Sequence, residues 1–139
     1  MCNNDNNCKC ISEILTVISI LQQNANCSDA CLETCDRGFL GTSNPICNYN
    51  TRPICLYMCG SSDTALAMPT SRDDVTGEVT STVFRIEKID GCCATFRVLA
   101  PNPDTTQANP YISTNSFFTV NLNCVCCLRC LPDTYIECI

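Results

Sequence analysis

The stretch TVFRIEKIDGCCATFRVLA, residues 82–100, decides the fold because it has the pattern of two β-strands around a turn. Apolar and polar side chains alternate on both sides of Asp90-Gly91, a dipeptide typical of hairpin turns. A two-residue turn would set Phe84 against the wrong face of the second strand. We therefore predict a three-residue loop with a bulge at Gly91, which pairs Phe84 with Phe96. This register gives one buried face made of Phe84, Ile86, Cys92, Ala94, Phe96 and Val98.

The segments on either side of this hairpin predict a helical start and further short strands. Ile11, Leu15 and Ile18 follow helical spacing, which predicts a helix over residues 9–23. A second short helix is expected after it, and strands are expected at 54–58, 65–68 and within 116–130. The sequence thus predicts an α+β fold, mainly β, with short N-terminal helices followed by an antiparallel β-sandwich-like domain. The tail and helices take residues 1–36 and the cysteine-rich β domain residues 37–139, as one structural unit.

Composition excludes several classes of function. The chain has 139 residues, 16 cysteines and no histidine, so it contains no Ser-His-Asp triad, no Cys-His pair and no histidine-ligated metal. A net charge of −6 does not fit a nucleic-acid binder. The most apolar stretch, residues 11–21, is too short and too polar to span a bilayer. We therefore expect no catalysis, no cofactor, no nucleic acid and no membrane partner.

The number of cysteines conflicts with the start of the chain. Disulfide-dense proteins belong outside the reducing cytosol, yet the polar segment Met1–Asn7 lacks the basic region of a signal peptide. Three explanations remain open at this point. The thiols bind a metal, a leader has been removed, or the protein is made in the cytosol and oxidised later.

Position along the chain divides the cysteines into two sets. Chain ends are poorly ordered unless they are tied down, so cysteines near the ends reach a neighbouring molecule most easily. Cysteines on expected helices and strands suit bonds within the chain, although Cys92 and Cys93, adjacent on a strand, point to opposite faces and cannot bond to each other. The inter-subunit candidates are Cys2, Cys8, Cys10 and Cys138. The intramolecular candidates are Cys27, Cys31, Cys35, Cys47, Cys55, Cys59, Cys92, Cys93, Cys124, Cys126, Cys127 and Cys130.

The segment CVCCLRC, residues 124–130, offers two other uses of the thiols, a zinc-binding module and a thiol oxidoreductase. Its C-x2-C spacings overlap at Cys127, and no second pair of that spacing completes a zinc site. Cys127-Leu128-Arg129-Cys130 has the spacing of a thiol oxidoreductase, and Arg129 would lower a thiol pKa. Such motifs normally begin a helix, however, whereas this one lies in an alternating strand pattern. That alternation predicts Cys124, Cys126, Leu128 and Cys130 on one face and Cys127 on the other.

Two segments of the chain are similar to a known family. VFRIEKIDGCCATFRVL (83–99) and VNLNCVCCLRCLPDTY (120–135) resemble the CotY/CotZ/ExsY proteins of the endospore coat and exosporium. The resemblance continues through TRPICLYMCG (51–60) and Cys8-Lys9-Cys10. The resemblance implies a structural protein that assembles into a hexagonal, disulfide-hardened layer at the spore surface. Its partners would be other copies of itself, which form a hexameric ring that tiles into a sheet, and other coat or exosporium proteins. It also implies synthesis in the mother-cell cytosol without a signal peptide.

Overall fold

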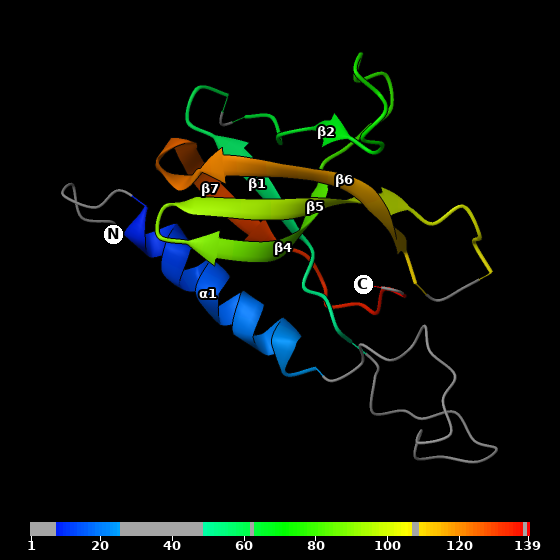
Figure 1. Ribbon diagram of the computed structural model, residues 1–139, viewed down its shortest axis with the longest axis horizontal. Helices are drawn as coiled ribbons and strands as arrows, with labels where there is room; N and C mark the ends of the chain where they lie inside the picture. Colours follow the sequence, from blue (N-terminus) through cyan, green and yellow to red (C-terminus); the bar gives the residue numbers. More distant parts are fainter. Residues whose placement is uncertain (1–7, 26–48, 62, 107–108, 138) are drawn as a thin grey trace.

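The computed structural model describes residues 8–25, 49–61, 63–106, 109–137 and 139. Within them one helix precedes an antiparallel sheet of five strands in the order β6-β5-β4-β1-β7 (Figure 1), and β2 and β3 form a separate short ribbon. The mainly β class with a short N-terminal helix is confirmed. The elements are α1 (Lys9–Gln23), β1 (Ile54–Met58), β2 (Met68–Pro69), β3 (Thr80–Ser81), β4 (Val83–Asp90), β5 (Cys93–Pro101), β6 (Tyr111–Asn121), the short 3-10 helix η3 (Leu122–Cys124) and β7 (Val125–Cys130).

Helix α1 has the bounds that the apolar spacing predicted. Leu15 and Ile18 are almost fully buried against the sheet. The polar Gln22 ends this buried stripe, and both the nitrogen and the oxygen of its side-chain amide are hydrogen-bonded. Its Nε2 donates to the Ile86 carbonyl at 3.0 Å, and its Oε1 accepts from the Arg52 amide at 3.0 Å. The helix is therefore fixed both to β4 and to the chain that leads into β1.

The central hairpin forms as predicted, but its register was predicted wrongly. Phe84 pairs with Val98 rather than with Phe96. The turn contains only two residues, Gly91 and Cys92, and Gly91 has a φ of +60°, which glycine adopts without strain. The predicted buried face is nevertheless correct for its strand residues, which are all 1% exposed or less: Phe84, Ile86, Ala94, Phe96 and Val98.

The bulge needed to match the two strands lies inside β4 instead of in the turn. The register shifts between Ile86 and Lys88, so Glu87 is the extra residue of the bulged strand β4. This shift reverses the alternation along the end of β4. Ile89 thereby also packs against the core, which a bulge placed at the turn would not achieve.

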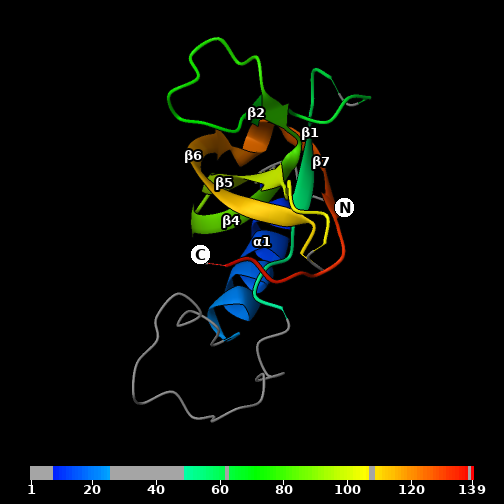
Figure 2. The same ribbon diagram turned by 90° about the vertical axis from the view of Figure 1, so that its right-hand side faces the viewer.

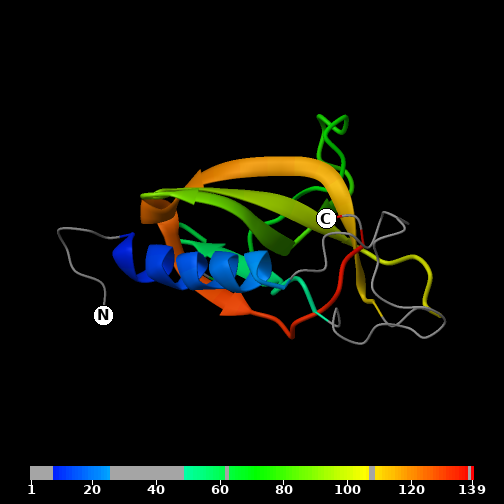
Figure 3. The ribbon, with the colours of Figure 1, turned by 60° about the horizontal axis from the view of Figure 1, so that its bottom comes forward.

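The sheet curves around α1, and the helix takes the place of a second sheet. Figures 2 and 3 show α1 lying along the inner side of the curved strands. Side chains from α1 and from all five strands share one apolar cluster, in which the Phe84 ring lies 4.8 Å from that of Phe118. The sandwich-like layering that we expected is thus absent from the described residues, because the apolar stripe of α1 covers the face that a second sheet would have covered.

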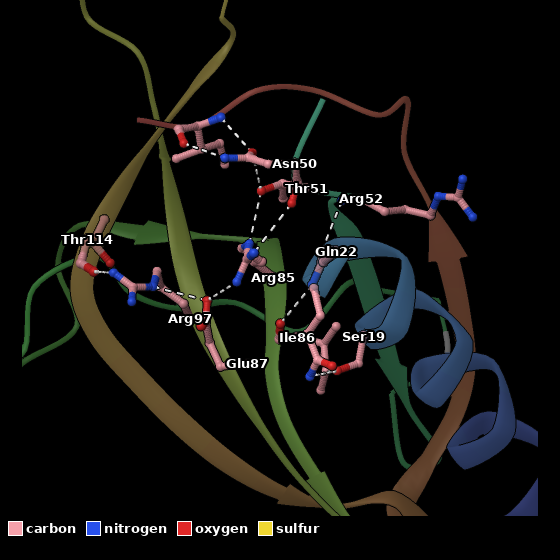
Figure 4. Close-up of polar contacts among 12 residues, drawn as sticks. Ser19, Gln22, Asn50, Thr51, Arg52, Arg85, Ile86, Glu87, Arg97 and Thr114 are labelled. Carbon is pink, nitrogen blue, oxygen red and sulfur yellow. Dashed lines mark hydrogen bonds and ion pairs between the residues drawn. The ribbon is translucent and has the colours of Figure 1, made fainter. Parts of the chain in front are cut away.

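On the other face of the hairpin, two arginines share one carboxylate (Figure 4). Arg85 and Arg97 lie opposite each other on β4 and β5, where their two positive charges would repel each other without a partner. Glu87 lies between them, 2.8 Å from Arg85 Nη1 and 3.2 Å from Arg97 Nε. Arg85 Nε also donates to Thr51 Oγ1 at 2.9 Å. This cluster therefore fastens the segment before β1 to the sheet.

The C-terminal segment is also fixed, through a buried asparagine. Asn50 Nδ2 donates to the Ile136 carbonyl and Asn50 Oδ1 accepts from the Ile136 amide, each at 2.9 Å. Thr51 and Thr134 form an isolated antiparallel bridge beside this pair. The chain is consequently held in place up to Ile136, which is 1% exposed.

Candidate cross-linking site

One disulfide joins the start of α1 to the central hairpin. Cys8 and Cys92 are bonded, with their Cα atoms 5.6 Å apart, a normal separation for a disulfide. Cys8 was expected to bond between subunits because it lies near the chain end, and this bond within the chain corrects that expectation. The physical reason is burial: Cys8 caps α1, is 3% exposed and lies against the hairpin turn. Cys92 bonds within the chain, as expected, although it lies in the hairpin turn and not in a strand, and it does not bond to Cys93.

Several exposed thiols lie around this disulfide at one end of the sheet. The Cys92 carbonyl accepts from the Leu122 amide at 2.8 Å, which places η3 beside the hairpin turn. The Cys124 carbonyl in turn accepts from the Cys59 amide at 2.9 Å, which adds the end of β1. We call this region the cysteine-rich end. Its exposed thiols are Cys59, Cys93, Cys124 and Cys126.

The geometry of β7 differs from the predicted alternation. Its register against β1 shifts between Tyr57 and Met58, so that Tyr57 pairs with Cys127 while Met58 pairs with Val125. Cys126 is the additional residue, and Cys124 belongs to η3 rather than to the strand. The expected shared face of Cys124, Cys126, Leu128 and Cys130 is therefore wrong, because a bulge and a 3-10 turn interrupt the two-residue period.

Cys59, Cys124 and Cys126 form a close cluster of thiols. Desolvation, and next the neighbouring thiols of Cys126 and Cys124, raise the pKa of Cys59 above its usual value. The Cys59 and Cys126 thiols are also within hydrogen-bonding reach of each other. A raised pKa keeps Cys59 mainly protonated at neutral pH, so this thiol is not an activated nucleophile.

The other described cysteines outside the cysteine-rich end are Cys10, Cys55, Cys127 and Cys130. Cys55 is buried opposite Arg129, and burial raises the pKa of its thiol despite that arginine. Cys127 and Cys130 are exposed on the edge strand β7, so the Cys127-Leu128-Arg129-Cys130 motif lies in a strand and not at a helix start. Cys10 is exposed on the first turn of α1. The positions outside the described residues are Cys2, Cys27, Cys31, Cys35, Cys47 and Cys138.

The part of the chain that the structure describes contains no arrangement suited to a metal ion, and a hollow beside α1 is small. No group of three or more cysteine, aspartate or glutamate residues there has an arrangement that could hold a metal ion. A hollow between the end of α1 and residues 49–52 measures about 60 Å³. Ligand pockets usually measure about 300–1,000 Å³, so this hollow is too small for most substrates. Within the described residues, the concentration of thiols is the feature that points to a function.

Comparison with known proteins gives the family. A family model described as spore coat protein Z matches residues 1–111. The chain belongs to the spore coat protein Z family. The match includes α1, β1 and the central hairpin, and it ends before most of β6, so it leaves the resemblance of residues 120–135 untested. Searches of curated proteins and of solved structures gave no match.

Membership of the spore coat protein Z family supports a structural role at the spore surface rather than catalysis. Among the described residues, no helix is long and apolar enough to cross a membrane. The sequence did not reveal that the hairpin turn, η3 and the end of β1 meet at one end of the sheet. The signal was present in part, since Cys59 follows a predicted strand and Cys92–Cys93 and Cys124 begin predicted strands, but the contact of η3 with the hairpin turn is needed to bring them together.

Proposed function

We propose that this protein is a self-assembling component of the spore surface and that disulfides between copies harden the layer it forms. The carrying observation is the cysteine-rich end, where four exposed thiols lie on β5, η3, β7 and the end of β1, next to elements that contact a disulfide already closed within the chain. Exposed thiols on a rigid sheet end are accessible to a neighbouring copy. This proposal moves cross-linking toward Cys93 and Cys124, which the sequence had suggested as intramolecular, and keeps Cys10 as an exposed candidate.

The outer face of α1 supports non-covalent contact between copies. Ile14, Val17 and Leu21 follow the three- and four-residue spacing by which helices pack on each other, and each is 44% exposed or more. The helix contains only two charged residues, Lys9 and Glu13, so little repulsion opposes contact with a second copy. We assign this face to the same helix of a neighbouring copy.

Weak contacts and late oxidation together account for the order of assembly. Subunits made in the mother-cell cytosol meet under reducing conditions, where misplaced contacts reverse. Oxidation after lysis then fixes the correct neighbours. A closed ring that also tiles sideways, such as a hexamer, extends into a sheet of this kind, with other coat or exosporium proteins as further partners.

Serine variants test this function directly. Purified full-length protein, oxidised at high concentration, is compared with the double variant Cys93→Ser/Cys124→Ser and with the matched control Cys127→Ser/Cys130→Ser, whose changes lie in the edge strand. Assemblies of wild type and control should survive hot detergent without reductant, whereas those of Cys93→Ser/Cys124→Ser should dissolve to monomers. Equal resistance in all three proteins would refute the role of the cysteine-rich end.

A further inference from the structure

The end of β1 and the start of β7 bring three cysteines, Cys59, Cys124 and Cys126, into neighbouring positions. The last paired residues of these strands are Met58 and Val125, and the next residues outward are Cys59 and Cys124. The bond from the Cys59 amide to the Cys124 carbonyl, 2.9 Å long, continues the pairing of the two strands past their ends. Residues that oppose each other on antiparallel strands have Cα separations of about 4.5–5.5 Å, within the range that disulfides require.

The bulge in β7 decides which thiol Cys59 meets. Because Cys126 is the additional residue of β7, its side chain departs from regular alternation, and of the two neighbouring thiols it has the larger effect on the Cys59 thiol. Cys127, one residue further, instead pairs with Tyr57 in the ladder. Three thiols can close only one disulfide, so one of them must remain.

We propose that Cys59 and Cys126 close a disulfide within the chain, which joins β1 to the edge strand β7, and that Cys124 remains as the thiol of this cluster that bonds to a neighbouring subunit. The first half of this assignment is independent of assembly. The second half rests on the proposed function. In this assignment Cys59 and Cys126 fix the end of the sheet, and Cys124 links the sheet to another copy.

The oxidant is a low-molecular-weight disulfide, such as oxidised glutathione. The Cys126 thiolate attacks one sulfur of this disulfide, which forms a mixed disulfide and releases one small thiolate. Cys59 then loses its proton and attacks the Cys126 sulfur, so the bond between Cys59 and Cys126 forms and the second small thiolate leaves. The two protons lost by the protein end on the two released thiols. Two protein thiols are oxidised and one small disulfide is reduced.

Peptide mapping of dilute full-length protein tests the pairing. The reduced protein is oxidised with oxidised glutathione, its remaining thiols are alkylated, and it is cut with chymotrypsin. Cleavage after Tyr57 and Leu66 gives a peptide in which Cys59 is the only cysteine, and cleavage after Leu122 and Leu128 gives NCVCCL, residues 123–128. Fragment ions of the linked pair identify the cysteine of NCVCCL that carries the bond.

We expect the bond on Cys126, with a yield that does not change over a tenfold range of protein concentration. Cys127→Ser, the matched control one residue away, should give the same yield. A bond to Cys124 or Cys127, full alkylation of Cys59, or a yield that rises with protein concentration would overturn the pairing. In concentrated protein, Cys124→Ser should retain this bond while cross-linked dimers fall at least fivefold. If Cys124→Ser retains the bond but forms as many dimers as wild type, only the role of Cys124 is overturned. The Cys59–Cys126 pairing is then still supported, so the two parts of the proposal are tested separately.

Discussion

Replacing both members of the Cys8–Cys92 disulfide should cause a large loss of stability. The bond closes a loop with a sequence separation of 84. In the chain-entropy treatment, a loop of this size restricts the unfolded chain by about 4.5 kcal/mol at 25 °C. Measured effects usually fall below that value, so the expected loss for the variant Cys8→Ala/Cys92→Ala is about 2–4 kcal/mol.

The assay is urea unfolding of dilute, oxidised, full-length protein, followed by circular dichroism. Both cysteines must be replaced together, because a single replacement leaves a thiol that can pair elsewhere. When both proteins are measured in reductant, wild type and the double variant should have nearly equal stability, because the Cys8–Cys92 bond is then absent from both. Cys93→Ala, which removes the exposed neighbour of Cys92, is the matched control and should change stability by no more than about 0.5 kcal/mol.

The reasoning would be refuted by a loss below about 1 kcal/mol in the double variant, or by an equal loss in Cys93→Ala. Either result would mean that the start of α1 is held to the hairpin by packing and by the Ser12 Oγ contact to the Gly91 carbonyl rather than by the disulfide. Cys8 would then be available for a bond to another subunit.

Three further predictions concern α1 and the surface. Gln22→Ala should cost about 1–3 kcal/mol in urea unfolding, because the Ile86 carbonyl and the Arg52 amide lose their buried partner; a loss below 0.5 kcal/mol, as an order-of-magnitude limit for surface changes, would contradict this. Val17→Glu should leave the circular dichroism spectrum unchanged and reduce assembly measured by light scattering at least tenfold, and unchanged scattering would remove α1 from the interface. Arg52 lowers the pKa of Asp133, so this pair stabilises the fold above the unfolded pKa of about 3.9 and the effect is lost as pH falls through the lower, folded pKa. The exposed pair is worth less than about 1 kcal/mol, so Asp133→Asn should lose that small amount at pH 7 and nothing at about pH 2; a loss independent of pH would exclude the ion pair as its cause.

Local periodicity was enough to predict individual elements. The bounds of α1 and β1 match the prediction because their apolar residues repeat at the period of a single, uninterrupted element. The hairpin shows where such reasoning ends. A two-residue turn does not match the apolar alternation of the two strands, so one extra residue is needed. The alternation does not show where along a strand that residue lies. The core decided it, because a bulge at Glu87 lets Ile89 pack inward.

Contacts between distant segments could not be predicted from the sequence. Cys8 was classed with the mobile ends because it precedes the first helix, and only the position of the hairpin turn against α1 shows that it is buried. Asn50 has no pattern that would predict its pair of hydrogen bonds with Ile136, which lies 86 positions away. The candidate site has the same origin, since η3 links the end of β6, which pairs with Cys93, to the start of β7, which lies beside Cys59.

The most direct test of the central claim is electron microscopy of the purified, concentrated protein before and after oxidation, with the cross-linked peptides mapped from the same sample. The account predicts ordered arrays that form in reductant, resist dilution only after oxidation, and contain linked peptides from the cysteine-rich end of different subunits. A protein that remains monomeric at high concentration, with every disulfide closed within one chain, would contradict the account.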